Sequence, residues 1–280
     1  MTEISAAAVK ALREETNVGM MECKRALVEA KGSHAAALKI LRERGIVTAS
    51  KKAARTTNHG VIASAIASGG KAGSLIEVNC ETDFVAKNPG FLSFVRTLAE
   101  KAVAADIDPA ESAKAEIIGK IAEIGENIVW RRALRYVLQG GGAVVSYVHH
   151  GNLIGVLLEV GCRKDETALN PVFLETAKDL CLQVAASNPR FLDRGKVPAD
   201  IVAAEREIFA KQVQGKPPAI LEKIVSGKMN KYYEQECLLE QPFIKDPAKN
   251  ITALLKEKNA LVEDTLEIRR FARFQVGEAV

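Results

Sequence analysis

The side chains best suited to nucleophilic or metal chemistry in this chain are five cysteines and four histidines. The cysteines form no Cys-x-x-Cys pair and none has a histidine at ligand spacing, so the sequence predicts neither a zinc site nor a disulfide framework. His149 and His150 are adjacent in a strand-like run, where neighbouring side chains point to opposite faces and cannot readily share a metal ion. Cys80 and Cys162 end two matched apolar strands and are interpreted as buried core thiols. We expect no resident metal and no catalytic cysteine.

Motifs for nucleotide binding and acid–base catalysis are also missing from the sequence pattern. The glycines around Lys71 do not form a phosphate-binding loop, because that motif requires glycine where Ala65 stands and serine or threonine where Ala72 stands. Glu77 and Glu159 lie within apolar strands, which favours a structural role on one sheet face over catalysis. We therefore expect a protein with no catalytic residues and no cofactor, and not an enzyme.

An internal repeat is the most informative feature of the sequence. Residues 75–92 read LIEVNCETDFVAKNPGFL and residues 157–174 read LLEVGCRKDETALNPVFL, and the two segments align without gaps at an offset of 82. Ten of the eighteen aligned positions are identical, which chance does not explain. The same offset aligns Ser64 with Ser146, so the repeated unit begins before these segments. The sequence predicts two copies of one structural unit.

The two copies differ at the loop that follows the matched strand. The first copy has Phe84 and Val85 where the second has Glu166 and Thr167. If the second copy shows what the fold alone requires, Phe84 is unnecessary for folding and is available for insertion into another molecule. Its burial there would stabilise a complex by about 1.5–3 kcal/mol. The alternative is that Phe84 packs against its own domain, and the sequence leaves both interpretations open.

Each copy is predicted to form a strand, a turn, a second strand, a loop and a helix. The turns are expected at Gly69-Gly70 and at Gly151-Asn152. The helices are expected to begin at Asn88-Pro89 and at Asn170-Pro171, where asparagine caps the exposed amides and proline loses no hydrogen bond. A small antiparallel sheet covered by a helix gives an α+β fold class.

The segments outside the repeat are predicted to be largely helical. Apolar stripes predict three short helices, of which the second ends at Gly32 and the third at Gly45. A polar linker is expected to follow near residues 51–58. The other predicted elements are helices at 109–121, 200–213, 218–232 and 251–258, a strand at 128–138 and a final strand-rich segment. The expected domains are a three-helix module at 1–54, a first α+β subdomain at 55–141, a second at 142–199 and 250–280, and an inserted antiparallel helical hairpin at 200–249.

Composition and charge exclude several classes of protein. With 280 residues, 48% of them hydrophobic, no apolar run approaches the roughly 18 residues that a membrane-spanning helix needs. No leader segment opens the sequence and the cysteine usage fits a reducing compartment, so we expect a cytoplasmic protein. Residues 1–55 hold eleven Lys and Arg against six Asp and Glu, whereas the rest of the chain is nearly neutral. Such a basic segment suits nucleic acid, an acidic protein surface or solvent.

Two other functional classes stay open on the residues alone. An RNA-binding protein would use the basic N-terminal segment, although that segment lacks interleaved aromatic side chains. A metabolic enzyme built on duplicated α+β units would need a polar pocket with a perturbed acid, base or nucleophile, for which no motif is present.

Several motifs in the same order along the chain carry a family resemblance. They are residues 16–24 (TNVGMMECK), 77–87 (EVNCETDFVAK), 124–128 (IGENI), 154–156 (IGV), 184–189 (VAASNP), 241–243 (QPF) and 273–278 (RFQVGE). In these segments the sequence resembles the elongation factor Ts family, the nucleotide-exchange partners of the translational GTPase elongation factor Tu. Residues 129–132 are less typical of the family. Because the sequence reaches Val280 soon after Gly277-Glu278, we expect the extra C-terminal helix of some relatives to be missing.

The resemblance implies a fold and a site. The fold would comprise an N-terminal three-helix module of ubiquitin-associated type, two related α+β subdomains with small antiparallel sheets, and a coiled-coil hairpin inserted in the second subdomain. The family's exchange loop corresponds to Thr82, Asp83, Phe84 and Val85. Asp83 and Phe84 are implied to push between two helices of the GTPase domain and to disturb its bound magnesium.

The resemblance also implies the partner and the activity. The protein would bind elongation factor Tu in its GDP-bound and nucleotide-free forms, and would promote GDP release so that GTP rebinds. The N-terminal module is implied to contact the same GTPase domain, which would give its positive charge an acidic protein surface. No direct contact with nucleic acid or membrane is expected, and the resemblance leaves open a homodimer or a complex of two copies of each protein.

Overall fold

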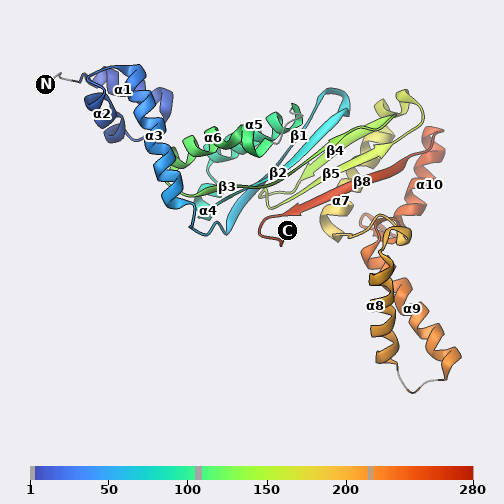
Figure 1. The fold of residues 1–280 in the computed structure, drawn as a ribbon. Helices are drawn as coiled ribbons and strands as arrows, with labels where there is room; N and C mark the ends of the chain where they lie inside the picture. Colours follow the sequence, from blue (N-terminus) through green and yellow to red (C-terminus); the bar gives the residue numbers. More distant parts are fainter. Residues whose placement is uncertain (1–3, 105–108, 214, 216, 280) are drawn as a thin grey trace.

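The computed structural model describes residues 4–104, 109–213, 215 and 217–279. Outside the described residues lie 1–3, 105–108, 214, 216 and 280. They include the two ends of the predicted domains and two positions of the predicted hairpin. The molecule consists of a three-helix group at the N-terminus, two three-stranded sheets with helices on their outer faces, and a pair of helices that projects from the core (Figure 1). This arrangement confirms the predicted α+β fold class.

The N-terminal group contains helices α1 (Ala6–Thr16), α2 (Met20–Glu29) and α3 (His34–Lys52). Serine side chains begin two of these helices, because Ser5 accepts a hydrogen bond from the Ala8 amide and Ser33 accepts one from the Ala36 amide. Apolar residues from all three helices form a common buried cluster, made of Val9, Leu12, Cys23, Ala26, Leu27, Ala37 and Leu41.

Helix α3 is longer than the sequence predicts, and the prediction of a stop at Gly45 is wrong. The helix continues to Lys52 and packs against α6 (Pro109–Ile124). A side chain at Gly45 would lie 3.6 Å from both Ala122 and Ile118, so the glycine permits close approach of the two helices and does not end one. The Lys52 ammonium also donates to the carbonyl of Gly125. The first part of the predicted polar linker is therefore helical and attached to the core.

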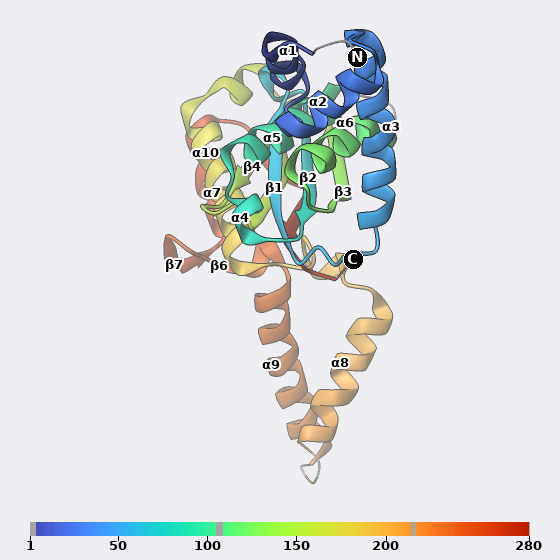
Figure 2. The same cartoon turned by 90° about the vertical axis from the view of Figure 1, so that its left-hand side faces the viewer.

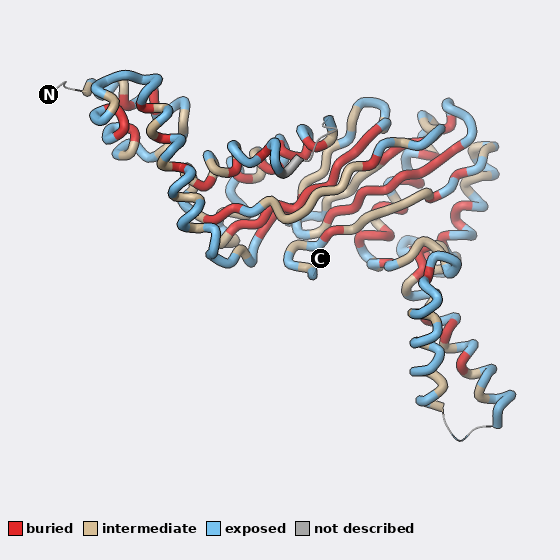
Figure 3. The backbone as a smooth tube through the Cα atoms, in the orientation of Figure 1, coloured by how far each residue is buried: buried red, intermediate tan, exposed pale blue. Residues whose placement is uncertain are grey.

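The two sheets have the same construction. The first sheet contains strands β1 (His59–Ile66), β2 (Ala72–Cys80) and β3 (Ile128–Val137), and the second contains β4 (Gly142–Val148), β5 (Ile154–Gly161) and β8 (Glu267–Gln275). Both sheets are antiparallel, with β2 and β5 at their centres. Because both faces of a central strand are covered, β2 is buried along its whole length and β5 almost entirely (Figure 3).

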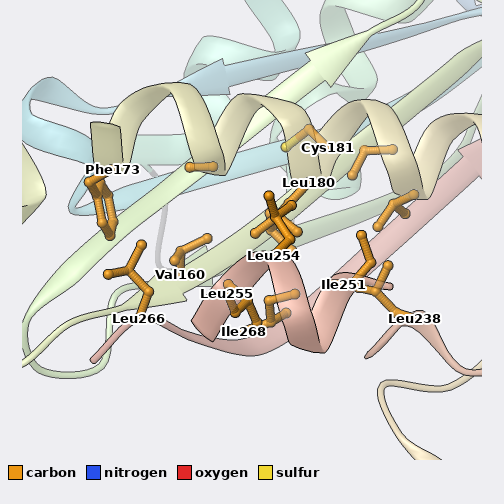
Figure 4. Packing of buried hydrophobic residues seen from close by; sticks show 14 of the residues in the cluster. Val160, Phe173, Leu180, Cys181, Leu238, Ile251, Leu254, Leu255, Leu266 and Ile268 are labelled. Atoms are coloured by element: carbon orange, nitrogen blue, oxygen red, sulfur yellow. The ribbon is translucent and has the colours of Figure 1, made fainter. Parts of the chain in front are cut away.

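Helices cover the outer face of each sheet. Helices α4 (Asp83–Ala86) and α5 (Pro89–Ala104) follow β2, whereas α7 (Pro171–Ser187) and α10 (Ile251–Val262) cover the second sheet. Asn88 accepts a hydrogen bond from the Gly90 amide at 2.8 Å, and Asn170 accepts one from the Val172 amide at 2.8 Å, which confirms both predicted helix starts. Figure 4 shows the second core, in which residues of α7 such as Phe173 and Leu180 pack over Val160 of β5 and Leu254 of α10. The predicted duplication is thus confirmed in three dimensions.

The inner faces of the two sheets pack against each other around a cluster of buried apolar residues. The cluster contains Ile62, Leu75, Tyr136, Val144, Leu157 and Phe274. Gly73 pairs with Tyr136 across one sheet, and Gly155 pairs with Phe274 across the other. A side chain at Gly155 would lie 2.9 Å from Leu75 and would also collide with Ile62, so glycine is required for this spacing of the sheets. The hydroxyl groups of the repeat partners Ser64 and Ser146 meet at 2.9 Å between the sheets.

A pair of helices projects from the second sheet region. Helices α8 (Ala199–Gln212) and α9 (Pro218–Glu236) project from the core as a pair (Figures 1 and 2). Buried Val225, Met229 and Tyr232 of α9 share a cluster with apolar residues of α8. A short ribbon of β6 (Pro242–Phe243) and β7 (Asp246–Asn250) leads back to α10. The predicted helices at 200–213 and 218–232 are confirmed, with α9 extended by one turn.

Replacement of Gly155 by alanine tests the contact between the sheets. We expect Gly155→Ala to lower the free energy of unfolding by about 1–3 kcal/mol, because the new methyl group overpacks the interface. Gly119→Ala is a matched control, since Gly119 lies in α6 with no atom within 4 Å of the added carbon. The control should raise stability by about 0.5–1 kcal/mol. Urea unfolding of both variants measures the difference, and equal stabilities would contradict the interpretation.

Candidate functional site

The predicted loop at residues 82–85 forms a single helical turn, α4, directly after β2 (Figure 2). Thr82 has extended backbone geometry and its hydroxyl oxygen accepts the Val85 amide at 3.4 Å, so Thr82 caps the turn. Val85 is half-buried and packs on the core beneath α5. Two of the four predicted residues therefore fix the turn to the protein.

The other two predicted residues face solvent. The Phe84 side chain is 82% exposed, the highest fraction among the exposed large hydrophobic residues that the structure describes. Asp83 is neutralised by Lys87 one turn later, with 2.7 Å between the ammonium and the carboxylate. This hydrogen bond lowers the pKa of Asp83. The alternative that Phe84 packs against its own domain is wrong, because the turn presents the ring outward.

Glu126, which was not among the predicted site residues, supports the turn from below. Glu126 accepts hydrogen bonds from the backbone amides of Glu81 and Thr82 at 3.1 and 3.0 Å and from the Thr82 hydroxyl at 2.7 Å. Glu81 in turn accepts the Asn127 amide at 2.6 Å, which lowers the pKa of Glu81 together with the nearby charge of Arg55. Residues 81–82, which follow β2, and residues 126–127, which precede β3, therefore bind each other in both directions. Glu126 accepts amides of the first segment, and Glu81 accepts an amide of the second.

The second copy of the unit has the same support without an exposed aromatic residue. Asp264 accepts the amides of Arg163 and Lys164 at 3.1 and 3.0 Å and the Thr167 hydroxyl at 2.8 Å. The loop forms the short 3₁₀ helix η2 (Asp165–Leu169), and Glu166 is exposed at the position of Phe84. The amide of Lys164 is the largest cause of a lowered pKa of Asp264, at about 2.

A second repeat offset in the sequence indicates the equivalence of Glu126 and Asp264. The third strand of each sheet, β3 in the first and β8 in the second, repeats at an offset of 138 and not 82. The offset is larger because the second copy contains the inserted hairpin. At this offset Arg131-Arg132 aligns with Arg269-Arg270, and Glu126 aligns with Asp264. The register of the sheets confirms the alignment, since Arg132 pairs with Glu77 and Arg270 pairs with Glu159.

Glu77 and Glu159 have the structural role that was predicted for them. Both carboxylates are completely buried at the contact between the sheets, and each binds two consecutive arginines of the third strand. The distances to Arg132 and Arg270 are 2.7 Å. A β-bulge follows each glutamate in the register and turns both arginines toward it.

Neither cysteine nor metal chemistry is supported within the described ranges. Burial raises the pKa of Cys80 to about 12 and also raises that of Cys162, so both thiols are protonated at neutral pH. Each thiol donates to a backbone carbonyl at 3.2 Å. Across the described residues, no group of three or more His, Cys, Asp or Glu side chains could hold a metal ion. No helix of the described part is long and apolar enough to span a membrane.

A surface hollow lies on the N-terminal helices. It has a volume of about 800 Å³ and is formed between α1 and α2. Met20 and Met21 supply exposed apolar surface, with exposed fractions of 54% and 65%. Lys10, Arg13 and Lys24 contribute positive charge to its lining. An apolar groove with basic residues fits an apolar helix face flanked by acidic residues.

The support by Asp264 should appear in the pH dependence of stability. Its pKa is lowered from 3.8 to about 2 in the folded protein, so its contribution is complete above about pH 4 and is lost as the pH falls toward 2. We expect the stability difference between the wild type and Asp264→Asn to be constant near neutral pH and to shrink between pH 4 and pH 2. Urea unfolding at a series of pH values measures this difference, and a difference that stays constant down to pH 2 would contradict the assignment.

Comparison with known proteins identifies relatives over nearly the full chain. The family profile described as "Elongation factor TS" matches residues 81–278. A protein of Clostridium botulinum (strain Eklund 17B / Type B) named "Elongation factor Ts" is 40% identical over 290 residues, which cover 99% of this chain and 94% of the relative. A protein of Nitratidesulfovibrio vulgaris (strain DP4) with the same name is 42% identical over 277 residues, which cover 98% of this chain and 96% of the relative.

Proposed function

The chain belongs to the elongation factor Ts family, the nucleotide-exchange factors of translation elongation, and we propose that it acts on elongation factor Tu by inserting Phe84 into that GTPase. In this proposal the protein binds elongation factor Tu·GDP, promotes release of GDP and leaves a nucleotide-free complex that GTP can enter. The reaction needs no bond chemistry in this chain, so we propose a binding protein and not an enzyme.

The outward position of Phe84 is the observation that carries the proposal. The ring is 82% exposed on a turn whose neighbours Thr82 and Val85 are fixed to the core. A large apolar side chain held in solvent gains about 1.5–3 kcal/mol when a partner buries it. The sister unit folds with exposed Glu166 at this position, which indicates that the ring serves a partner and not the fold.

Linkage explains how insertion would release the nucleotide. A factor that binds the nucleotide-free GTPase more tightly than the loaded one must weaken nucleotide binding by the same ratio. Each tenfold weakening requires about 1.4 kcal/mol of differential binding, so burial of one ring accounts for one or two decades at most. We therefore propose that Asp83 and Phe84 separate two helices of the GTPase and disturb its magnesium ion, which neutralises the phosphates of the bound nucleotide.

The other parts of the chain would supply affinity and orientation. We propose that the three-helix group of residues 1–54 is a module of ubiquitin-associated type that docks on the same GTPase domain through the hollow between α1 and α2. The excess positive charge of this segment would face an acidic surface. We further propose subdomains at 55–141 and at 142–199 with 250–280, and a coiled-coil role for the hairpin within 200–249.

Phe84→Ala tests the exchange mechanism. We expect the GDP release rate of elongation factor Tu at saturating factor to fall about 10- to 100-fold, because the variant loses the apolar surface that insertion buries. Leu169→Ala is a matched control, since Leu169 is 77% exposed on the equivalent turn of the sister unit. Release of a fluorescent GDP analogue measures both variants, and a wild-type rate with Phe84→Ala would remove the ring from the mechanism.

A double substitution in the N-terminal hollow tests the docking role of that module. We expect Met20→Ser with Met21→Ser to weaken binding to elongation factor Tu about tenfold or more, because two exposed thioethers lose their apolar contact. Val28→Ser is the control, since Val28 is 56% exposed on α2 but does not line the hollow. Calorimetric titration gives both affinities. Equal affinities for the double variant and the wild type would assign the contact to another surface.

A further inference from the structure

We infer that Glu126 is a positioning residue for nucleotide exchange, which sets the orientation of the turn that carries Phe84. The inference rests on the proposed function, because it gives Glu126 a role in exchange only through Phe84. Glu126 lies 42 positions after Phe84 in the chain and follows α6, so the chain brings it beneath the turn only in the folded protein.

The contacts of Glu126 fix the start of α4 as a rigid unit. One carboxylate oxygen accepts the amides of Glu81 and Thr82, and the other accepts the Thr82 hydroxyl. Thr82 is the capping residue of α4, so the same carboxylate holds both the peptide planes that enter the turn and the side chain that begins it. Hydrogen bonds to a charged acceptor are shorter and about twice as strong as neutral ones, so three of them from adjacent groups restrict the start of the turn.

The turn requires this external support because it is very short. Helix α4 spans Asp83–Ala86, four residues, whereas a helix becomes favourable only when many hydrogen bonds follow its costly first turn. The ring of Phe84 is 82% exposed, so it contributes little buried surface that would hold the turn in place. The direction in which Phe84 points is therefore determined mainly by the anchoring of Thr82 and Val85. Glu126 accepts the amide and the hydroxyl of Thr82, and the Cys80 thiol donates to the Thr82 carbonyl.

The residue after Glu126 extends the support to the N-terminal helices. Asn127 is buried, donates its backbone amide to Glu81 and donates its side-chain amide to the carbonyl of Arg55 at 2.9 Å. Arg55 follows the end of α3 and also lies 3.4 Å from the Glu81 carboxylate. The turn, the end of α6 and the chain leaving α3 are thus joined at one point, which orients Phe84 relative to the proposed docking module.

The sister unit supplies an internal control for this inference. Asp264 makes the same type of contacts with the amides of Arg163 and Lys164, but the turn above it carries no exposed aromatic residue. In that unit the hydroxyl comes from Thr167, at the position of Val85, and not from the capping residue. If the contact serves folding alone, removal of either carboxylate should lower stability and leave exchange unchanged. If it also serves exchange, removal of Glu126 but not of Asp264 should slow GDP release.

The experiment compares Glu126→Ala, Glu126→Gln and Asp264→Ala in the full chain. GDP release from elongation factor Tu is measured over a range of factor concentrations, which separates the maximal rate from the half-saturating concentration. We expect Glu126→Ala to lower the maximal rate per folded molecule about tenfold and to leave the half-saturating concentration within about threefold of wild type. Glu126→Gln should fall between, because its carbonyl oxygen still accepts the two amides.

The control and the double variant distinguish positioning from stability. Asp264→Ala should lower the melting temperature to a similar extent as Glu126→Ala while both exchange parameters stay at wild-type values. Glu126→Ala combined with Phe84→Ala should be no slower than Phe84→Ala alone, because Glu126 acts through the ring. Additive losses in the double variant, or a wild-type maximal rate for both Glu126 variants, would overturn the inference.

The outcomes also separate this inference from the proposed function. If Phe84→Ala slows GDP release and the Glu126 variants do not, the ring acts in exchange and Glu126 does not position it. If Phe84→Ala itself releases GDP at the wild-type rate, the proposed function of the turn fails and the inference fails with it. Should Glu126→Ala not fold, the near-isosteric Glu126→Gln gives the decisive maximal rate.

Discussion

Two buried glutamates, each paired with a partly exposed arginine, constrain how the two sheets lie against each other. Arg132 binds Glu77 of its own sheet and stacks on Phe274 of the other sheet, 4.2 Å from the ring centre. Arg270 does the same in the opposite direction with Glu159 and Tyr136, also at 4.2 Å. Loss of one partner of a buried pair leaves an uncompensated charge, so the two pairs make alternative registers of the sheets unfavourable.

The two packed sheets explain why the side chain on one turn can change without loss of the fold. Both β2 and β5 end in a cysteine-containing segment, a supported turn and a helix capped by asparagine. In both copies the asparagine cap of the following helix, the carboxylate below the turn and the apolar core hold the turn in place. None of these contacts depends on the side chain at the apex of the turn. That side chain is free to differ, and it is Phe84 in one copy and Glu166 in the other. The duplication therefore separates the requirements of folding from those of binding.

The sequence predicted features that are local or repeated at a constant offset, and it missed those that depend on distant backbone. Helix caps at Asn88 and Asn170 and the strands around each turn follow from short patterns. The comparison of the two copies singled out Phe84 but left its direction open, and the structure shows that the side chain is exposed. Gly45 misled because a glycine at a helix–helix contact and a glycine at a helix end look the same in sequence. Glu126 was missed because a side chain that binds backbone amides imposes no residue type on its partners.

In the proposed complex, the turn that carries Phe84 and the hollow on the N-terminal helices would make different contributions. In the proposed mechanism, insertion of Phe84 would not bear the entropy cost of folding a loop, because the turn is already formed in the unbound protein. Separating Asp83 from Lys87 costs little, since their ion pair is exposed to solvent. Yet one ring offers too little surface to hold two proteins together at physiological concentrations. In the proposed complex, stable association would come from broader surfaces such as the hollow lined by Met20 and Met21. The turn would then act on the difference between the loaded and the empty partner.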